Sequence, residues 1–225
     1  MFTRYAIFYT FPSSPIADFC AAWLGWDIAR GVAIAHPKLD ELDVAAITDV
    51  PRKYGAHGTI KPPFVLADGM TQSGLLDAVA NLCGNTQAVA MDKLELASLG
   101  RFLALCPLCE TQALTNLAAQ VVRDLDRFRA PMSADELARR SSANLTQTQQ
   151  TNLNIWGYPH VMDAFKFHIT LTGRLDKQTL TQVKSTLEPM ITPLLPQPFH
   201  IDSLTLVGQR EDGMFEQIQR YPLAP

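Results

Sequence analysis

Apolar and polar residues follow two different periods along this chain, and each period predicts one kind of element. Stretches that alternate at every second residue and are rich in aromatic or β-branched side chains predict strands over residues 4–11, 57–66, 101–108 and 165–175. Stretches of helical period predict helices over residues 15–26, 70–84, 112–128 and 177–191. A final hairpin is expected over residues 200–223, with its turn near Asp212 and Gly213. Residues 38–56 show neither period, and we expect a loop with at most one helical turn there.

The order of these predicted elements repeats along the chain. A strand and a helix precede the strand of His57, and a helix and the sequence MDKLEL follow it. The strand of His168 has the same neighbours, and the sequence IDSLTL follows it. His57 lies 35 residues before Asp92, and His168 lies 34 residues before Asp202. This match indicates an internal duplication of about a hundred residues, which has too few copies to form a solenoid. Two related lobes that share one face are therefore expected.

Each copy carries the same short motif, in which a histidine is followed two positions later by a threonine. The motifs are His57-Gly58-Thr59-Ile60 and His168-Ile169-Thr170-Leu171. Side chains two residues apart in a strand point to the same face, so each histidine shares a face with its threonine. Lys61 has the same parity in the first strand. Two such faces opposed by pseudo-symmetry bring two imidazoles, two hydroxyls and Lys61 around one cleft.

This set of side chains suits the hydrolysis of a cyclic phosphodiester. One imidazole activates water as a base and the other protonates the leaving sugar oxygen, because the histidine pKa lies near neutrality. The threonine hydroxyls donate hydrogen bonds to phosphate oxygens, and a lysine stabilises the developing charge. This chemistry requires no metal and no cofactor. The five histidines show no HxH or HExxH spacing, which disfavours a metal site.

The composition and net charge of the chain limit the kinds of molecule that it is expected to bind. The chain has 225 residues, of which 47% are hydrophobic and 18% charged, and this is typical of a globular protein with a sizeable core. The net charge of −3 argues against binding to long nucleic acid, which favours strongly basic proteins. We therefore expect a small phosphate-containing substrate. The sequence shows no signal peptide and no apolar stretch long enough to span a bilayer, so we expect no membrane association and a cytoplasmic location.

The paired motifs resemble those of the 2H phosphoesterase superfamily, which includes RNA ligase-like cyclic phosphodiesterases. Several segments also resemble the DUF1045 group, described as phosphonate-metabolism proteins: RYAIFYTFP, AAWLGWD, PRKYGAHGTIKPPF, LGRFLAL, FRAPMSADELARR and WGYPHVMDAFKFHITLTG. The resemblance covers nearly the whole chain. It implies that His57, Thr59, His168 and Thr170 form the catalytic set, and it suggests a cyclic phosphate of ribose as substrate.

The resemblance also implies an α+β fold of two pseudo-symmetric βα lobes with antiparallel sheets around a central cleft. The whole chain, residues 1–225, is then a single domain. Its lobes are approximately residues 1–100, completed by an exchange of the final hairpin, and residues 101–225. The polar segment 129–160 is expected to be a helical insertion that lies beside the cleft and helps to choose the substrate.

Further residues and functions remain candidates. Tyr158, which precedes the second motif, and Tyr5, on the first strand, are candidate substrate ligands beside Lys61. An RNA 2′,3′-cyclic phosphodiesterase or a 2′–5′ RNA ligase-like enzyme is an alternative within the same chemistry. A non-catalytic nucleotide- or phosphate-binding protein is an alternative from another class. Cys106 and Cys109 form a CxxC pair, for which a thiol-redox role is the last alternative.

Overall fold

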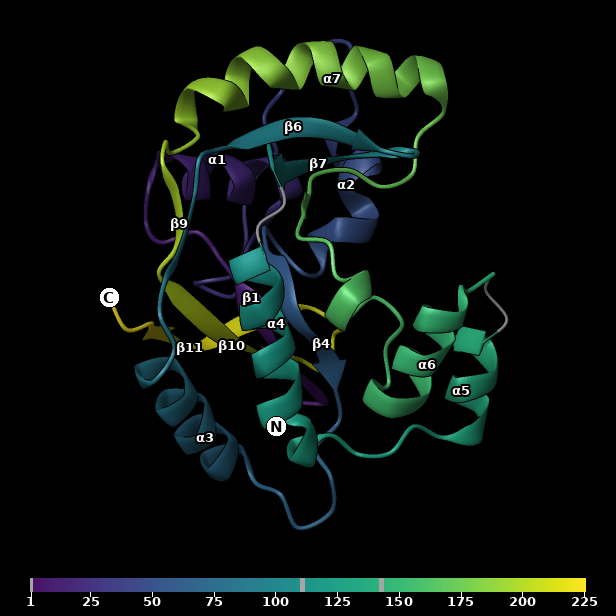
Figure 1. The fold of residues 1–225 in the computed structure, drawn as a ribbon. Helices are drawn as coiled ribbons and strands as arrows, with labels where there is room; N and C mark the ends of the chain where they lie inside the picture. Colours follow the sequence, from purple (N-terminus) through teal and green to yellow (C-terminus); the bar gives the residue numbers. More distant parts are fainter. Residues whose placement is uncertain (1, 110–111, 142–143) are drawn as a thin grey trace.

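An antiparallel sheet organises the molecule (Figure 1). The computed structural model describes residues 2–109, 112–141 and 144–225. The described residues form one seven-stranded sheet in the order β11-β10-β1-β4-β8-β7-β6. Its strands are β1 (Arg4–Tyr9), β4 (Gly58–Phe64), β6 (Leu94–Leu99), β7 (Phe102–Pro107), β8 (Ile169–Thr170), β10 (Ser203–Gln209) and β11 (Phe215–Pro222). Two short ladders accompany it, β2 (Trp26–Asp27) with β3 (Val32–Ala33), and β5 (Val89–Met91) with β9 (Phe199–Ile201). The expected α+β class with antiparallel strands is confirmed.

The strand order places corresponding strands of the two predicted repeats at matching distances from the centre of the sheet. The motif strands β4 and β8 are neighbours, with β1 outside the first and β7 outside the second. Beyond them, β10 pairs with β1 and β6 pairs with β7. In the second half it is therefore β10 that lies beside β1, the first strand of the chain, while β6 of the first half lies beside β7 of the second. The two halves form one continuous sheet, which is joined where Gly58 of β4 faces Ile169 of β8.

Helices cover one face of the sheet. The longer helices are α1 (Pro15–Leu24), α3 (Gln72–Gly84), α4 (Gln112–Asp124) and α7 (Lys177–Ile191). Helix α3 packs on β10 and β11, α4 packs on β4, and α7 packs on β6 and β7 (Figure 1). The main hydrophobic core fills this layer and includes Ile7, Leu105 and Ile169. A smaller cluster lies on the opposite face of the sheet around Phe8 and Phe215.

Two segments differ from the sequence prediction. Residues 38–56 contain the helix α2 (Val44–Arg52), whose first turn is capped by the Asp43 side chain accepting a hydrogen bond from the Ala46 amide. The prediction of a loop there was wrong. The helix has only nine residues, so its cap and its short apolar face gave too brief a pattern to show a helical period. The second motif strand is also shorter than expected, since β8 pairs with β4 and β7 only near Ile169 and Thr170.

The segment 129–160 forms a separate helical layer at one side of the molecule (Figure 1). It holds α5 (Ala134–Ser141) and α6 (Gln147–Trp156). The side chain of Thr146 caps α6 together with Gln149 in a reciprocal capping box. Short 3-10 turns flank this layer at η1 (Asp126–Phe128) and η2 (Met162–Ala164), and η3 (Thr192–Leu194) follows α7. No helix among the described residues has the length and apolar character needed to cross a membrane.

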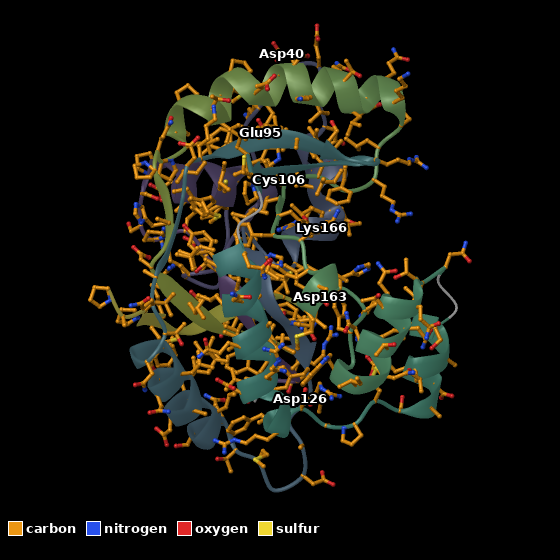
Figure 2. The ribbon with its side chains drawn as sticks, viewed as in Figure 1. Asp40, Glu95, Cys106, Asp126, Asp163 and Lys166 are labelled. Carbon is orange, nitrogen blue, oxygen red and sulfur yellow. The ribbon has the colours of Figure 1, made fainter. Side chains whose placement is uncertain are left out.

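The two cysteines of the CxxC pair lie at the end of β7 and just beyond it. Cys106 faces Glu95 of β6 across the ladder, and the two labelled residues lie close together in Figure 2. Burial and the nearby carboxylate raise the pKa of the Cys106 thiol to about 11. Cys109 is exposed, and both cysteines are free thiols. A thiol with so high a pKa carries little thiolate at neutral pH, which disfavours redox exchange.

Candidate functional site

The two motifs meet at the seam of the sheet. Gly58 and Ile169 face each other in the antiparallel pairing of β4 with β8. Continuing this register by one residue in each direction places His57 opposite Thr170 and Thr59 opposite His168. Directly opposed side chains in such a pair have Cβ atoms roughly 4.5–5.5 Å apart. The four motif side chains therefore form a quartet on one face of the sheet, in which each histidine has the other repeat's threonine as its neighbour.

Both imidazoles are oriented by the same backbone contact. Nδ1 of His57 lies 3.0 Å from the Gly55 carbonyl oxygen, and Nδ1 of His168 lies 2.9 Å from the Lys166 carbonyl oxygen. Each acceptor is two residues before its histidine. A carbonyl oxygen can only accept a hydrogen bond, so each Nδ1 carries the proton and donates it. Each Nε2 is then available to take up or release a proton, which is the role that general acid–base catalysis requires.

The surroundings of His57 keep its imidazole uncharged. Its ring packs against Phe8, with ring centroids 4.0 Å apart, and against Tyr54, at 5.4 Å. The pKa of His57 is lowered to about 4, mainly by burial and also by the positive charge of a protonated His168, while the hydrogen bond to Gly55 opposes the shift. His57 is therefore neutral at pH 7, with Nε2 unprotonated. This state suits a general base.

The quartet lines a pocket of about 350 Å³. His57, Thr59, His168 and Thr170 all contribute to its surface. A pocket of this size lies at the small end of ligand-binding cavities and suits a small molecule. Three arginines, Arg4, Arg140 and Arg174, also line it, and none of the described lining residues is Asp or Glu. The pocket is therefore electropositive in a chain whose net charge is negative.

The predicted ligand Tyr158 lies in the pocket wall, on the segment that follows α6. The guanidinium of Arg140 lies 5.6 Å from the centre of its ring. Arg140 also donates a hydrogen bond of 2.6 Å to the Gly157 carbonyl oxygen and pairs with Glu136 at 2.6 Å. These contacts connect α5 with the end of α6. The helical layer thus supplies one wall of the pocket.

Lys61, predicted to bind phosphate, lies outside the pocket. Phe8 pairs with Thr59, but the next residue of β1, Ile7, pairs with Lys61, so the ladder contains a bulge at Ile60. A bulge adds one residue to its strand and reverses the alternation of side chains beyond it. The Lys61 side chain therefore points to the helix-covered face, where it is 2% exposed. The prediction from parity was wrong because it assumed a regular strand.

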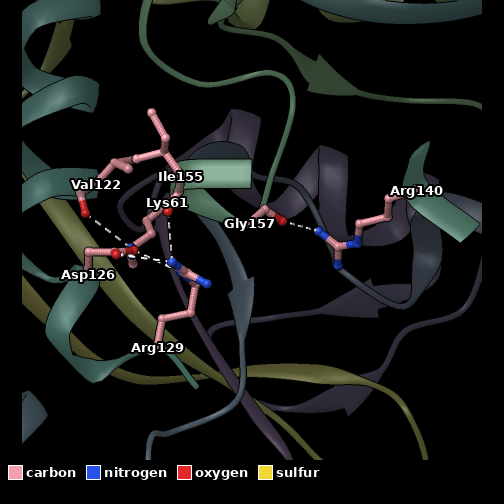
Figure 3. A network of polar contacts seen from close by, with 7 residues as sticks. All are labelled: Lys61, Val122, Asp126, Arg129, Arg140, Ile155 and Gly157. Carbon is pink, nitrogen blue, oxygen red and sulfur yellow. Dashed lines mark hydrogen bonds and ion pairs between the residues drawn. The ribbon is translucent and has the colours of Figure 1, made fainter. Parts of the chain in front are cut away.

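Lys61 belongs instead to a polar network on the far side of the sheet (Figure 3). Its Nζ donates to the Val122 carbonyl oxygen at 3.1 Å and lies 3.5 Å from an oxygen of Asp126. Arg129 donates to both oxygens of Asp126, at 2.8 and 3.0 Å. The same guanidinium donates to the Ile155 carbonyl oxygen near the end of α6, at 3.1 Å. The network fastens the helical layer to β4.

Tyr5 also lies away from the pocket. It belongs to the core on the helix-covered face, and its hydroxyl donates a hydrogen bond of 3.0 Å to Gln72 Oε1. The residues of β1 that share the pocket's face are Arg4, Ala6 and Phe8. The candidate role of Tyr5 as a substrate ligand is therefore corrected. Because β1 is apolar on both faces, its alternation did not indicate which face meets the pocket.

Several pocket residues, among them Arg4, Phe8 and Tyr54, were absent from the sequence prediction. Arg4 and Phe8 have the parity opposite to Tyr5, so a correct choice of face would have found them. Tyr54 lies three residues before His57, where the sequence carries no periodic signal. Among the described residues, no three His, Cys, Asp or Glu side chains are grouped as a metal site would require.

Comparisons with known proteins identify relatives of the whole chain. The family model described as "Protein of unknown function (DUF1045)" matches residues 59–216. The chain is 31% identical over 231 residues to a protein of Janthinobacterium sp. (strain Marseille) named ribose 1,5-bisphosphate phosphokinase PhnN. The aligned region covers 99% of this chain and 51% of that protein. The chain spans about half the length of the curated relatives it matches.

Solved structures provide a second comparison. A crystal structure of a phosphoesterase has 15% sequence identity and a TM-score of 0.47, with full coverage of both chains. The crystal structure of E. coli LigT complexed with 3′-AMP has 14% identity and a TM-score of 0.47, covering 99% of this chain and 98% of that one.

Proposed function

We propose that this chain, which belongs to the DUF1045 family, is a metal-independent phosphoesterase of the 2H type that hydrolyses a cyclic phosphodiester on a ribose-type small molecule. The observation that carries the proposal is the quartet at the seam of β4 and β8. It presents two imidazoles with free Nε2 atoms and two hydroxyls to one pocket. Cyclic phosphodiester hydrolysis needs one base, one acid and donors for the phosphate oxygens, and the quartet supplies each of them.

The proposed reaction has a single displacement at phosphorus. Nε2 of His57 takes a proton from water, and the resulting hydroxide forms a new bond to phosphorus. The bond between phosphorus and one ring oxygen breaks, and His168, which enters the reaction as an imidazolium protonated at both nitrogens, gives its Nε2 proton to that sugar oxygen. Thr59 and Thr170 donate hydrogen bonds to the two non-bridging oxygens. His57 is assigned as the base because its lowered pKa leaves it unprotonated at neutral pH.

The substrate class follows from the pocket and from the curated relatives. The pocket of about 350 Å³ suits a sugar phosphate better than a polymer. The name of the Janthinobacterium relative refers to ribose 1,5-bisphosphate, which is a ribose phosphate. Opening a 1,2-cyclic phosphate of ribose 5-phosphate at the bond to O2 would yield that compound. The more specific form of the proposal is that this chain catalyses this ring opening in phosphonate metabolism.

We do not assign a phosphokinase activity to this chain. Its sequence contains no Gly-x-x-x-x-Gly-Lys-Ser/Thr motif, with which P-loop kinases hold the phosphates of a nucleotide. The curated relatives extend well beyond the region matched here. We infer that phosphorylation of ribose 1,5-bisphosphate belongs to the part of those proteins that this chain does not cover.

Turnover of a small panel of cyclic phosphates tests the proposal. The panel includes 5-phosphoribosyl 1,2-cyclic phosphate, nucleoside 2′,3′-cyclic phosphates and RNA ending in a 2′,3′-cyclic phosphate. His57→Ala and His168→Ala should each lower kcat/KM by about 10²–10⁴-fold. His200→Ala, at an exposed position of β9, is the matched control and should retain activity. EDTA should not change the rate.

Different outcomes separate the alternatives. Preference for RNA ends over small cyclic phosphates, with inhibition by tRNA, would replace the proposed substrate by RNA. Binding of cyclic phosphates without turnover would indicate a phosphate-binding protein. Loss of activity in EDTA would refute the metal-independent mechanism.

A further inference from the structure

We infer that the pocket contains a second phosphate subsite, built around Arg4, that holds a phosphate monoester carried by the same substrate as the cyclic phosphate. The inference rests on the proposed function, which assigns the cyclic phosphate to the quartet of His57, Thr59, His168 and Thr170. It adds a specificity-determining residue outside both motifs. The substrate class that follows is a sugar cyclic phosphate with a separate terminal phosphate.

Arg4 lies on the pocket's face of the sheet but away from the quartet. It begins β1, and Phe8, four residues later, pairs with Thr59 and packs on His57. Four residues of a strand span roughly 13 Å. The next residue of β1, Tyr5, pairs with Phe64 of β4. Arg4 therefore lies at the end of the pocket that Pro62 and Pro63 line. A long arginine side chain spans part of this interval, which leaves room for a sugar between the two phosphates.

The contacts of Arg4 orient its guanidinium without neutralising its charge. Its Nε donates a hydrogen bond of 2.6 Å to Gln209 Oε1, which is a neutral acceptor. Its guanidinium carbon also lies 6.0 Å from the centre of the Phe215 ring. Within the described part of the chain, Arg4 has no ion pair, and its two terminal nitrogens have no hydrogen-bond partner. A fixed guanidinium with both terminal nitrogens free is suited to bidentate binding of phosphate.

The rest of the pocket lining favours an anion. Arg140 and Tyr158 line the same pocket, on the wall formed by the helical layer. Arg140 is partly neutralised by Glu136, whereas Arg4 has a neutral partner. No described lining residue is acidic, so a bound dianion meets no opposing carboxylate in the lining. A cyclic phosphodiester carries one negative charge, and the cationic lining exceeds what that single charge requires.

Arg174 provides a matched control at the other end of the pocket. It follows the second motif, and its neighbour Gly173 donates a hydrogen bond to Ile47 of α2. Because β8 runs antiparallel to β4, the chain beyond Thr170 runs toward the start of β4, away from Pro62 and Pro63. Arg174 is exposed and has neither an ion pair nor a hydrogen bond among the described residues. Arg174 therefore carries the same charge as Arg4 but lies at the opposite end of the pocket.

Kinetics with two substrates test the inference: ribose 1,2-cyclic phosphate and its 5-phosphorylated form. The readout is the ratio of their kcat/KM values. Arg4→Gln should lower the preference for the phosphorylated substrate by about 10- to 100-fold, as expected for the loss of hydrogen bonds to a charged group. Arg4→Lys, which keeps the charge without the planar guanidinium, should recover part of the preference. Arg174→Gln should change both substrates by the same factor and leave the ratio unaltered. Thermal denaturation establishes that each variant is folded.

Binding of ribose 5-phosphate separates this inference from the proposed function, since that probe carries the monoester and no cyclic phosphate. Calorimetry should show binding to the wild type and to Arg174→Gln, and at least tenfold weaker binding to Arg4→Gln. This pattern supports the subsite even if neither cyclic substrate is turned over, in which case only the proposed reaction fails. Two results would refute the subsite while leaving the proposed reaction intact. One is that Arg4→Gln turns over both substrates with the wild-type ratio of kcat/KM values, and the other is that only Arg174→Gln loses the preference for the phosphorylated substrate.

Discussion

Replacing Lys61 by methionine should stabilise the protein at neutral pH and leave turnover intact. The side chain of Lys61 is 2% exposed, and burial is the main reason why its pKa falls from 10.5 to about 8. Arg129 contributes to this lowering of the pKa, while Asp126 opposes it. Methionine has a similar length and no charge, so it fills the same space without a buried ammonium. Replacement of buried charges by apolar groups of similar volume is often neutral or stabilising.

The pH dependence gives the magnitude. Below pH 8 Lys61 is protonated in both the folded and the unfolded chain, and the folded state bears the whole cost of its burial. Between pH 8 and 10.5 the unfolded chain keeps the proton that the folded chain has lost, so stability rises with pH. At about 1.4 kcal/mol per pH unit, this interval amounts to about 3 kcal/mol. The methionine variant lacks this gain, so its advantage over the wild type should shrink by about 2–3 kcal/mol between pH 7 and 10.

Urea denaturation at pH 7, 8, 9 and 10 measures this difference. Subtracting the wild-type free energy of unfolding from that of Lys61→Met cancels the titration of groups common to both proteins. Lys177→Met, at an exposed lysine in the first turn of α7, is the matched control and should show a difference that does not vary with pH. A pH-independent difference for Lys61→Met would refute the account of its burial. A large loss of kcat would return Lys61 to the active site.

Three further predictions concern the pocket and the cysteines. Because the base must be unprotonated and the pKa of His57 is about 4, the acidic limb of the kcat/KM profile should lie near pH 4, and an acidic limb near 6.5 would contradict this. Gly58→Ala would place a methyl group against the Phe167 ring with no room for it, so it should lower the free energy of unfolding in urea by about 1–3 kcal/mol and also lower kcat/KM. Cys106→Ser combined with Cys109→Ser should leave turnover unchanged with or without reductant, since a redox role would make the rate depend on both thiols.

The motif residues could be found from the sequence because two independent regularities indicated them. A spacing of two residues fixes a common face within a strand, and the duplication related His57 to His168. The pairing of β4 with β8 then brings the two motifs together at one pocket. The amphipathic helices were predictable for a similar reason, since α4 and α7 each repeat their apolar positions over several turns. Their catalytic roles remain a prediction.

Other features depend on contacts between distant segments, which no local pattern records. The bulge at Ile60 is set by the pairing of β4 with β1, and it moves Lys61 to the other face. The choice of face on β1 is made by the helices that pack on it, and this placed Tyr5 in the core. Tyr54 reaches His57 because the chain after α2 leads directly into the first motif. Each of these errors concerns a side chain judged from its own strand or loop alone.

The pairing of β1 with β10 delays completion of the sheet during synthesis. Ile7 of β1 pairs with Leu206 of β10, so the two strands are separated by nearly the whole chain. At about 5–20 residues per second, a ribosome takes on the order of ten seconds or more to make the intervening segment. Throughout that time the amino-terminal repeat lacks the strand that closes its half of the sheet, and β1 presents an unpaired edge. The native sheet can therefore be completed only after the last hairpin has emerged.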